Sequence, residues 1–452
     1  MHGARSPSFW ICVAVIGSSA CEPRKEISRP EATSTKPVPA TSKARDVDPI
    51  VRNAERMVTE GRRIFRYDTF GSEAFWGTAL KLHHAIAGSA RGGVGSGLSP
   101  KAALGVGLKV DVEKLPDSLA TALRAGKVDL DDVDNTVALL RANAVVGVKG
   151  IFADERITSI GITCALCHST VDDSLAPGIG KRLDGWANRD LDVGAVIGLA
   201  PDLTPVTRLL GVDDTTLHKV LKSWGQGKFD AQVFLDGTAF RPDGRSAATL
   251  IPPAFGLAGI NMHTSTGWGS ITYWNAFVAN LEMHGQGTFY DPRLDDATRF
   301  PVAAKARSGH VANAEDQITA KLAALQFYQL AIPAPMPASG SFDAGAATRG
   351  QVIFIGAGKC ATCHVPPLYT EPGYNMHTPA EIGIDEFQSN RSPDKRYRTA
   401  PLKGLFAHQK GGFYHDGRFA KLDDVVKHYD EKMSLSLTAD QQHDLVEFLK
   451  SL

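Results

Sequence analysis

The sequence has little cysteine, no net charge and, after its first residues, no long apolar run. Four of its 6 cysteines belong to two short motifs, and the other two, Cys12 and Cys21, lie near the N-terminus, so the body holds no disulfide framework. Lysine plus arginine equals aspartate plus glutamate at 49 each, which argues against a nucleic-acid-binding surface. Since no run after residue 20 reaches the length of about 18 apolar residues that predicts a membrane span, we expect the body to span no membrane.

The N-terminal segment predicts export. Residues 1–20 contain Arg5, a short apolar run and small residues, which together are typical of a signal peptide. Two interpretations of the following Cys21 remain open: the lipidated cysteine of a bacterial lipoprotein, or ordinary cleavage after Ala20. Residues 21–48 are rich in Pro, Ser, Thr, Lys and Glu and predict a flexible tether. We therefore expect a periplasmic or other extracytoplasmic protein, with membrane anchoring through Cys21 as one alternative.

Two copies of Cys-x-x-Cys-His, at residues 164–168 and 360–364, are the most informative feature of the chain. At this spacing two thiols can add to the vinyl groups of a haem while the histidine binds its iron. A redox dithiol or half of a zinc site is the competing interpretation, but no other cysteine lies nearby to complete a zinc site. The sequence therefore predicts two covalently bound haem c groups, held by Cys164, Cys167, His168, Cys360, Cys363 and His364.

A weak internal repeat predicts two related domains. Residues 61–65 and 350–354 share the pattern Gly-x-x-Ile-Phe, and in the second copy Cys360 follows six residues later. In the first copy Cys164 follows 99 residues later (164 − 65), which indicates an insertion of about ninety residues at 67–156. An insertion at this place is expected to become a cover, a substrate wall or a dimer contact.

The expected fold is mostly α, with two cytochrome c-type helical domains. The first domain, 49–330, is enlarged by the insertion, and a Pro-rich linker at 331–340 leads to the second domain, 341–452. In the second domain, apolar residues at helical spacing predict a helix over 422–432, and a capping box that begins at Thr438 predicts a last helix.

Parts of the chain resemble a known superfamily. Residues 397–405 and 412–426 resemble the second domain of the bacterial dihaem cytochrome c peroxidases, whose superfamily includes the methylamine dehydrogenase maturation enzyme; the likeness covers about 110 residues. The first domain is more divergent, and its residues 161–172 and 273–279 look like the branch that contains the dihaem rubber oxygenase. The resemblance implies a first haem that activates peroxide or dioxygen and a second haem that supplies it with electrons.

The resemblance also implies ligands for the second haem. In the peroxidases a methionine in the helix after His-Asp-Gly is the sixth ligand, and Tyr429 takes its place here. A tyrosine ligand at this place would be similar to that of the maturation enzyme. His428, one residue earlier, would instead give the bis-histidine ligation of the rubber oxygenase. Met433 is a third candidate, one turn further along. His428 and Tyr429 both remain open as metal ligands.

For the first haem the resemblance implies catalytic groups after Pro252. Glu282 lies near the expected position of the catalytic glutamate, which would move a proton between the peroxide oxygens. Trp268 is the expected electron bridge between the haems, and Trp274 competes for this role. The superfamily also binds calcium partly through backbone carbonyls of a Thr-x-Pro turn, which Thr399 and Pro401 keep. Four further histidines could each ligate or cap a haem instead: His83, His84, His263 and His284.

Two functions remain open from the sequence. One is a haem-dependent oxidoreductase of the peroxidase or oxygenase kind, and the other is an electron-transfer cytochrome with both irons six-coordinate. The long insertion and the absence of an obvious methionine ligand near His168 favour an open first iron, and hence the enzyme. The expected partners are a small electron donor, such as a monohaem cytochrome c or a cupredoxin, and peroxide, dioxygen or an organic substrate.

Overall fold

The protein is mostly helical, as the sequence predicts. The computed structural model describes residues 48–408 and 410–452, and from Pro49 onward these form one compact unit. The strands of the described part pair only two at a time, so they form short ribbons between helices. The predicted signal peptide, Cys21 and nearly all of the predicted tether lie outside the described residues. The domain boundaries inside the compact unit stay predictions.

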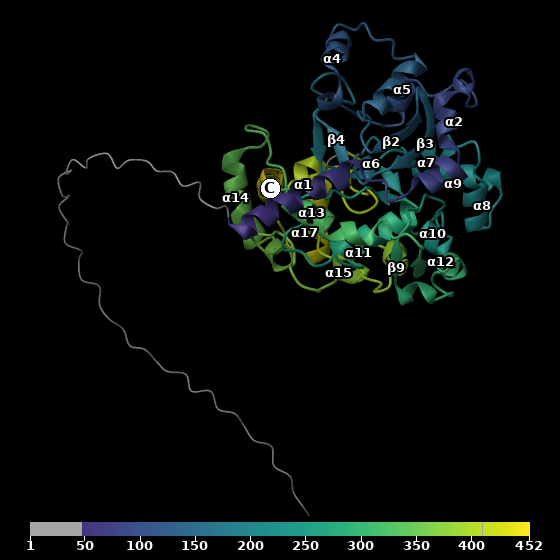
Figure 1. The fold of residues 1–452 in the computed structure, drawn as a ribbon. Coiled ribbons are helices and arrows are strands. Elements are labelled where there is room, and N and C mark those ends of the chain that lie inside the picture. Colours follow the sequence, from purple (N-terminus) through teal and green to yellow (C-terminus); the bar gives the residue numbers. More distant parts are fainter. Residues whose placement is uncertain (1–47, 409) are drawn as a thin grey trace, which may run out of the picture. The chain divides into compact units, whose positions relative to one another are not determined.

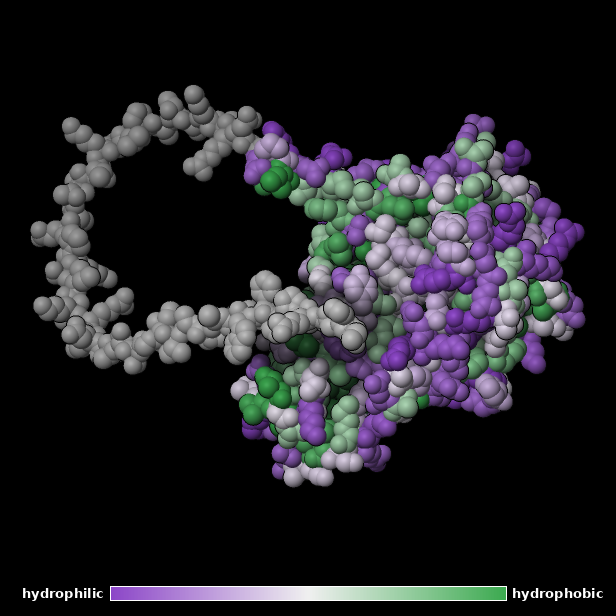
Figure 2. All heavy atoms as spheres, turned by 90° about the horizontal axis from the view of Figure 1, so that it is seen from below, coloured by the Kyte–Doolittle hydropathy of each residue, from purple (hydrophilic) through white to green (hydrophobic). Residues whose placement is uncertain are grey.

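The core of the described unit follows the two motifs. One cluster of buried apolar side chains packs against Cys164 and Cys167, and a smaller one packs against Cys360. Among the described helices, none has the length and apolar character that crossing a membrane requires. On the face drawn in Figure 2, hydrophobic residues are interspersed with hydrophilic ones.

The first Gly-x-x-Ile-Phe repeat lies on the long helix α1 (Pro49–Tyr67), which packs against α13 (Leu322–Ala331). A β-carbon at Gly61 would lie 2.0 Å from the carbonyl oxygen of Ala324, so a side chain there would force the helices apart. The isoleucine and phenylalanine of the repeat are fully buried. The pattern therefore marks a close helix crossing.

The second repeat lies on α14 (Ala344–Ile355), which packs in the same way against the last helix, α18 (Ala439–Ser451). A β-carbon at Gly350 would lie 1.9 Å from the carbonyl oxygen of Asp444. The Arg349 guanidinium donates to both oxygens of the Asp444 carboxylate, at 2.6 and 2.8 Å. In both halves of the chain the glycine of the repeat thus allows a close helix crossing.

The insertion forms a layer of short helices and one β-hairpin at the top of Figure 1. Its strands β2 (Val148–Ala153) and β3 (Arg156–Ile162) pair antiparallel, and β3 runs directly into the first motif. The other elements are η1 (Ala74–Ala79), α2 (Leu82–Ala87), η2 (Ser89–Arg91), α3 (Pro100–Gly105), β1 (Val110–Asp111), η3 (Val112–Lys114), α4 (Asp117–Arg124) and α5 (Val133–Arg141).

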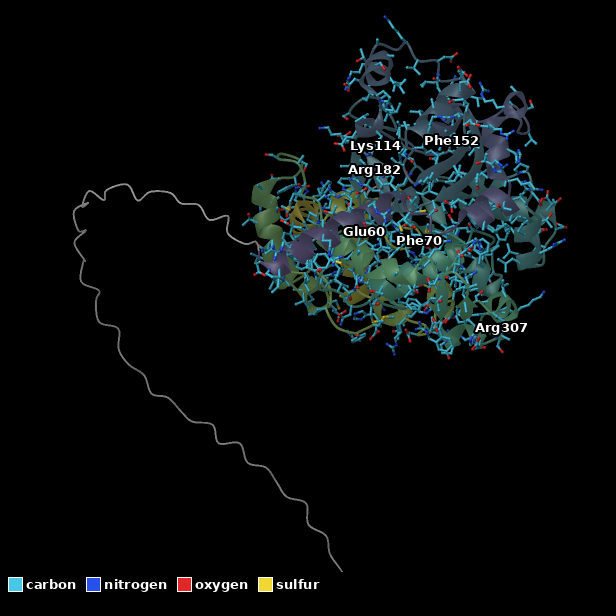
Figure 3. The ribbon with its side chains drawn as sticks, viewed as in Figure 1. Glu60, Phe70, Lys114, Phe152, Arg182 and Arg307 are labelled. Atoms are coloured by element: carbon cyan, nitrogen blue, oxygen red, sulfur yellow. The ribbon has the colours of Figure 1, made fainter. Side chains whose placement is uncertain are left out.

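Buried charges attach this layer to the rest of the unit. Arg182 pairs with Asp111 at 3.0 Å, and the side chains of both residues are almost completely buried. The Arg182 guanidinium and the Lys114 ammonium each lie 5.4 Å from the centre of the Tyr67 ring, at the end of α1, and Figure 3 shows these two cations close together. The insertion is therefore packed against the unit through specific contacts.

The middle of the chain carries the first motif and the walls that face it. The motif ends in a short helix, and one longer helical stretch continues without a break from α-helical into π-helical geometry. The elements are α6 (Ala165–His168), β4 (Ser169–Val171), β5 (Ile179–Gly180), β6 (Arg182–Asp184), α7 (Val193–Gly198), α8 (Thr204–Leu210), α9 (Asp214–Trp224), β7 (Lys228–Phe229), α10 (Val233–Asp236), β8 (Thr249–Leu250), α11 (Ile271–Phe277), η4 (Val278–Glu282), β9 (Thr288–Tyr290), η5 (Pro292–Asp295), α12 (Pro301–Ala306), β10 (His310–Ala312) and η6 (Thr319–Lys321).

The C-terminal segment follows its sequence signals closely. The helix predicted over 422–432 is α17 (Leu422–Met433), and the capping box that begins at Thr438 is present. The Thr438 hydroxyl accepts from the backbone N–H of Gln441 at 3.2 Å, and the Gln441 amide oxygen accepts from the backbone N–H of Thr438 at 2.9 Å. The remaining elements are η7 (Cys360–Thr362), α15 (Pro379–Ile382), α16 (Phe387–Asn390) and η8 (Leu405–His408).

Candidate functional site

One large cavity joins the two motifs. Its volume is about 550 Å³, and its walls come from both halves of the compact unit. Most of the lining side chains are aliphatic or aromatic, as an apolar cofactor or substrate requires. All six residues predicted from the motifs line it: Cys164, Cys167, His168, Cys360, Cys363 and His364.

The two motif histidines have the same hydrogen bond. Nδ1 of His168 lies 3.0 Å from the carbonyl oxygen of Pro252, and Nδ1 of His364 lies 3.2 Å from that of Tyr369. A carbonyl oxygen can only accept, so Nδ1 donates its proton and Nε2 keeps its lone pair. Burial lowers the pKa of His168, and it lowers that of His364 to about 4, which keeps both rings neutral. Neutral imidazoles oriented through Nδ1 are the usual form of a metal-binding histidine.

The motif cysteines are neutral thiols in apolar surroundings. Burial raises the pKa of Cys164 and Cys167 to about 12 and that of Cys360 to about 11, and it also raises that of Cys363. A zinc site or a redox dithiol depends on thiolates, which nearby cations or a metal stabilise. The surroundings therefore favour thiols that are consumed in covalent attachment over thiols that act as ions.

A small group of ionisable ligands lies beside the second motif. Among the described residues, Cys363, Glu371 and His377 are the only three such groups whose ligand atoms lie within 4.8 Å of one another. Glu371 already accepts from the His377 ring at 2.7 Å and from the Thr399 hydroxyl. The first motif has no equivalent in the described part, so a shared metal-ion role does not explain both motifs.

The cavity wall holds more cations than carboxylates; of the cations, Arg189 is buried, Arg398 is half-buried, and Lys359 and Lys403 are exposed. Of the described lining residues, Arg189, Lys359, Arg398 and Lys403 are cationic, whereas Glu282 is the single carboxylate. Burial lowers the pKa of both arginines to about 10. Nε and Nη1 of Arg189 have no hydrogen-bond partner in the described part of the chain, and Arg398 donates to the backbone carbonyl of Thr264 at 2.6 Å. Since an unpaired buried cation is costly, Arg189 fits a ligand that brings its own carboxylate, and Arg398, which has only carbonyl partners, can pair with a second one.

A haem c group meets these requirements. It is a large apolar ring with two propionates, two vinyl positions for the thiols and an iron for the imidazole. Each motif offers two thiols and one oriented imidazole, and the cationic wall can pair with the propionates. The residues present therefore fit two such groups, and Arg189 and Arg398 are partners that the sequence interpretation did not assign. Arg398 stands in the peroxidase-like run, whereas no local signal marks Arg189.

On the side of the first motif, Glu282 lines the cavity at the end of η4. It is half-buried, and burial raises its pKa to about 7. Trp274 also lines the cavity, whereas Trp268 lies outside the lining. The two rings belong to one aromatic cluster, with 5.8 Å between their centres. The structure thus brings Glu282 and Trp274 to the cavity, and the bridging role of Trp268 stays a prediction.

The other histidines divide into two groups. His263 and His284 line the cavity, and burial lowers the pKa of each to about 4. His83 and His84 belong to α2 in the insertion and lie outside the lining. His408 and His415, which the sequence interpretation did not assign, also line the cavity, and burial lowers the pKa of each to about 4. These four lining histidines are therefore neutral imidazoles that belong to neither motif.

On the side of the second motif, the structure separates the ligand candidates. Tyr429 and Met433 line the cavity. His428 lies outside the lining, and its Nε2 donates to the carbonyl oxygen of Ile382 at 2.9 Å. Successive residues on a helix point about 100° apart, and on α17 Tyr429 is turned to the cavity while His428 is turned to Ile382. The geometry favours Tyr429, and the identity of the sixth ligand stays a prediction.

The expected calcium site is occupied by internal hydrogen bonds. The carbonyl oxygen of Thr399 accepts from the Thr370 hydroxyl at 2.6 Å and from Nη1 of Arg398 at 3.3 Å. A cation bound to this oxygen would also face the Arg398 guanidinium. Calcium therefore stays a prediction.

Comparisons with known proteins place the chain in no family. No family model matches it, and no curated protein matches its sequence. Among solved structures, hydrazine synthase from Kuenenia stuttgartiensis, studied under 20 bar of xenon, is similar over 52% of this chain and 92% of that chain. The identity is 16% and the TM-score is 0.30, a level at which the likeness carries no weight for fold or function.

Proposed function

We propose that this chain is a dihaem c-type cytochrome that acts as an oxidoreductase, with two cytochrome c-type domains and a relation to the dihaem cytochrome c peroxidases. Cys164, Cys167 and His168 would hold the first haem, and the second motif would hold the other. When bound, haem c supplies an iron that exchanges single electrons and binds small oxygen species. The observation that carries the proposal is the pair of cavity-lining histidines, each held through Nδ1 by a backbone carbonyl.

The haem of the first motif is proposed to be the one at which peroxide reacts. Reduction of peroxide breaks the O–O bond, consumes two electrons and two protons, and yields two water molecules. The Glu282 carboxylate would accept a proton from one peroxide oxygen and return it to the departing oxygen. A pKa of about 7 suits both steps, because the group can gain and lose a proton near neutral pH.

The second motif is proposed to serve electron entry. Tyr429 lines the cavity on α17, and the ring of Tyr414 stacks on it with 6.4 Å between the centres. A tyrosine oxygen on the iron would lower its potential relative to a methionine. Electrons would come from a small periplasmic carrier, such as a monohaem cytochrome c or a cupredoxin. Replacing Cys21 with alanine, followed by fractionation, tests whether the protein is also anchored in the membrane.

An electron-transfer cytochrome is the second candidate. The observation in its favour is His263, a neutral cavity-lining histidine whose Nδ1 has no hydrogen-bond partner in the described part. A second imidazole on the first iron would close it to peroxide. In that case both irons would be six-coordinate, and the chain would pass electrons between partners.

Spectroscopy of the purified protein separates the two candidates. The enzyme requires two covalent haems per chain in the reduced pyridine spectrum and two distinct species in electron paramagnetic resonance. Cyanide, or carbon monoxide after reduction, should change one species and leave the other intact, and peroxide should shift the same one. Two low-spin haems that ignore all three reagents would establish the carrier, and a protein without covalent haem would refute both.

A further inference from the structure

The insertion reaches the cavity at one place. Of the described residues at 67–156, Phe75 and Trp76 line it, and both belong to η1, a π-helical turn. They face a second π-helical turn, η4, which ends at Glu282. Single π-helical turns occur often at functional sites, because the wider turn changes the direction of the side chains that follow.

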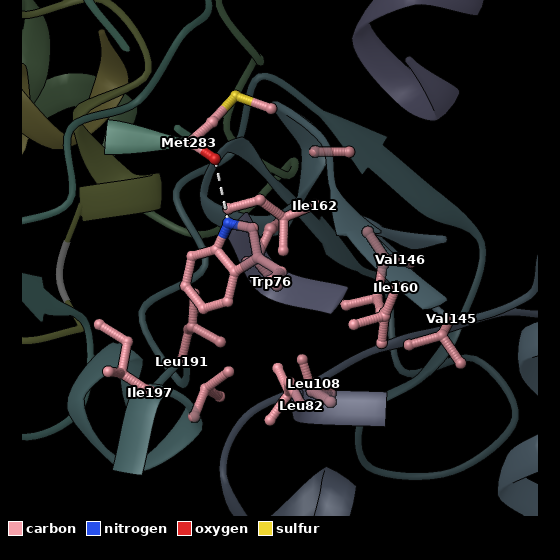
Figure 4. Close-up of a cluster of buried hydrophobic side chains, with 14 of the residues drawn as sticks. Trp76, Leu82, Leu108, Val145, Val146, Ile160, Ile162, Leu191, Ile197 and Met283 are labelled. Atoms are coloured by element: carbon pink, nitrogen blue, oxygen red, sulfur yellow. Dashed lines mark hydrogen bonds between the residues drawn. The ribbon is translucent and has the colours of Figure 1, made fainter. Parts of the chain in front are cut away.

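Two direct contacts join η1 to the residues directly after η4. Nε1 of Trp76 donates to the carbonyl oxygen of Met283 at 3.0 Å, as the dashed line in Figure 4 shows. The Phe75 ring stacks on the His284 ring, with 3.7 Å between the centres and 23° between the planes. Since carbonyls in the last turn of a helix have no partner within the helix, Trp76 supplies a donor that η4 lacks.

A backbone contact continues the same junction. The carbonyl oxygen of Phe70, a fully buried residue just before η1, accepts from the backbone N–H of Gln286 at 2.8 Å. The segment from Met283 to Gln286 is therefore held by Trp76, Phe75 and Phe70 at three points. All three contacts come from outside the segment's own helix.

The turn η1 is itself fixed from behind by the β-hairpin. A β-carbon at Gly77 would lie 1.8 Å from the Ser159 hydroxyl oxygen and 3.0 Å from the backbone nitrogen of Ile160, both on β3. Trp76 is 4% exposed and lies among Ile160, Ile162 and other apolar side chains in Figure 4. The hairpin thus supports η1, and η1 in turn supports the end of η4.

We propose that the insertion is a positioning device, in which Trp76 and Phe75 fix the turn at 282–284 and so hold the Glu282 carboxylate at the cavity. Trp76 and Phe75 are positioning residues, because they act through the backbone of Met283 and the ring of His284. The role given to Glu282 rests on the proposed function, whereas the contacts between η1 and the turn do not.

A matched pair of tryptophan variants tests this proposal in the haem-loaded protein. Trp76→Phe keeps most of the buried ring and removes the donor to Met283. Trp224→Phe is the control, because Trp224 is 2% exposed, belongs to the same buried cluster and has an Nε1 without a hydrogen-bond partner in the described part. Phe75→Leu removes the stack on His284 as a second, independent variant.

The first readout is amide hydrogen exchange of peptides covering 278–286. Losing one buried hydrogen bond should speed local exchange about fivefold in Trp76→Phe and leave it unchanged in Trp224→Phe. The second readout is the electron paramagnetic resonance signal of the first haem and its cyanide-binding rate. Both should change in Trp76→Phe and Phe75→Leu but not in Trp224→Phe, whereas general loosening of the core would affect all three variants.

Each outcome decides one question. Faster exchange together with an altered first-haem signal supports the positioning role. Unchanged exchange overturns it, and so does faster exchange with an unaltered haem signal, because the turn would then move without consequence for the site. Failure of the wild-type protein to react with peroxide would refute the enzyme but would leave the exchange result intact.

Discussion

Compared with the second motif, the first is assembled from more distant parts of the chain. His364 donates to Tyr369, 5 residues away, whereas His168 donates to Pro252, 84 residues away. Helix α14 ends five residues before Cys360, whereas the whole insertion separates α1 from Cys164. Both histidines nevertheless end with the same hydrogen bond and the same neutral ring. Equal chemistry on the histidine side is therefore reached by a local route and by a long-range route.

The residues that face the two motifs differ in kind. The first side has Glu282, with its pKa raised to about 7, held at a turn that the insertion contacts. The second side has Tyr429 on α17, a helix that follows its sequence pattern closely. A titratable acid suits proton transfer, and an oxygen ligand suits a closed iron. Under the proposed function, this difference predicts a division of roles between two sites that share the same attachment motif.

The largest expected effect tests whether attachment is really equivalent at the two motifs. Replacing Cys164 and Cys167 with alanine should lower covalent haem from two to one per chain, and replacing the cysteines of the second motif should do the same. The reason is that thioether bonds can form only where both thiols remain. Pyridine haemochrome spectra and intact mass measure the load. Retention of both haems in either double variant would show that this motif attaches no haem and would contradict the comparison.

Glu282 should distinguish the two sides most sharply. Glu282→Gln keeps the shape and removes the proton acceptor, so the reaction of the first haem with peroxide should slow about 100-fold. Stopped-flow absorbance of that haem measures the rate. Glu371→Gln makes the same chemical change beside the second motif and should leave the rate nearly unchanged. Equal slowing in both variants would show that the division of roles is wrong.

The pH dependence of that reaction sharpens the same point. Burial raises the pKa of Glu282 to about 7, so the carboxylate becomes protonated as the pH falls through this value. Only the deprotonated form can accept a proton, and the rate should therefore fall with decreasing pH around a midpoint near 7. In Glu282→Gln this midpoint should disappear. A midpoint that persists in the variant would assign the titration to another group.

Variants of two neighbouring residues test which side chain is the sixth ligand of the second haem. Tyr429→Phe should change the electron paramagnetic resonance signal of the second haem and raise its potential by on the order of 100 mV, since the axial ligand sets the potential. His428→Phe should leave both nearly unchanged, because His428 is bonded to Ile382 outside the cavity lining. The reverse result would make His428 the ligand and require α17 to turn. An effect of Met433→Leu alone would favour the methionine.

The smallest expected effect concerns the path between the two sides. Trp274→Phe should slow electron transfer between the haems several-fold, and Trp268→Phe should slow it less, because Trp274 lines the cavity and Trp268 packs behind it. Flash reduction followed at the two haem bands measures this rate. A larger effect at Trp268 would restore it as the bridge.

Short local sequence patterns predicted much of the structure of this protein. The Cys-x-x-Cys-His motifs, the Gly-x-x-Ile-Phe repeats and the capping box at Thr438 each involve residues a few positions apart, so their geometry follows from the backbone next to them. Glycine in the repeat also had a reason that the structure made visible, a close helix crossing in α1 and in α14. Such short-range signals sufficed for the mostly helical fold and the last helices, and haem attachment at the six motif residues stays a prediction.

Tertiary structure decided what faces the motifs. The Trp76–Met283 hydrogen bond joins residues 207 positions apart, and nothing in the pattern around either residue predicts it. That Tyr429 and not His428 lines the cavity depends on which side of α17 meets it, and Arg189, two of whose nitrogens have no partner among the described residues, stands out because it is buried. The sequence by itself determined which groups can attach a cofactor, because attachment needs only neighbours along the chain. Orientation, burial and proton affinity came from long-range packing, because they depend on the distant segments that surround each group.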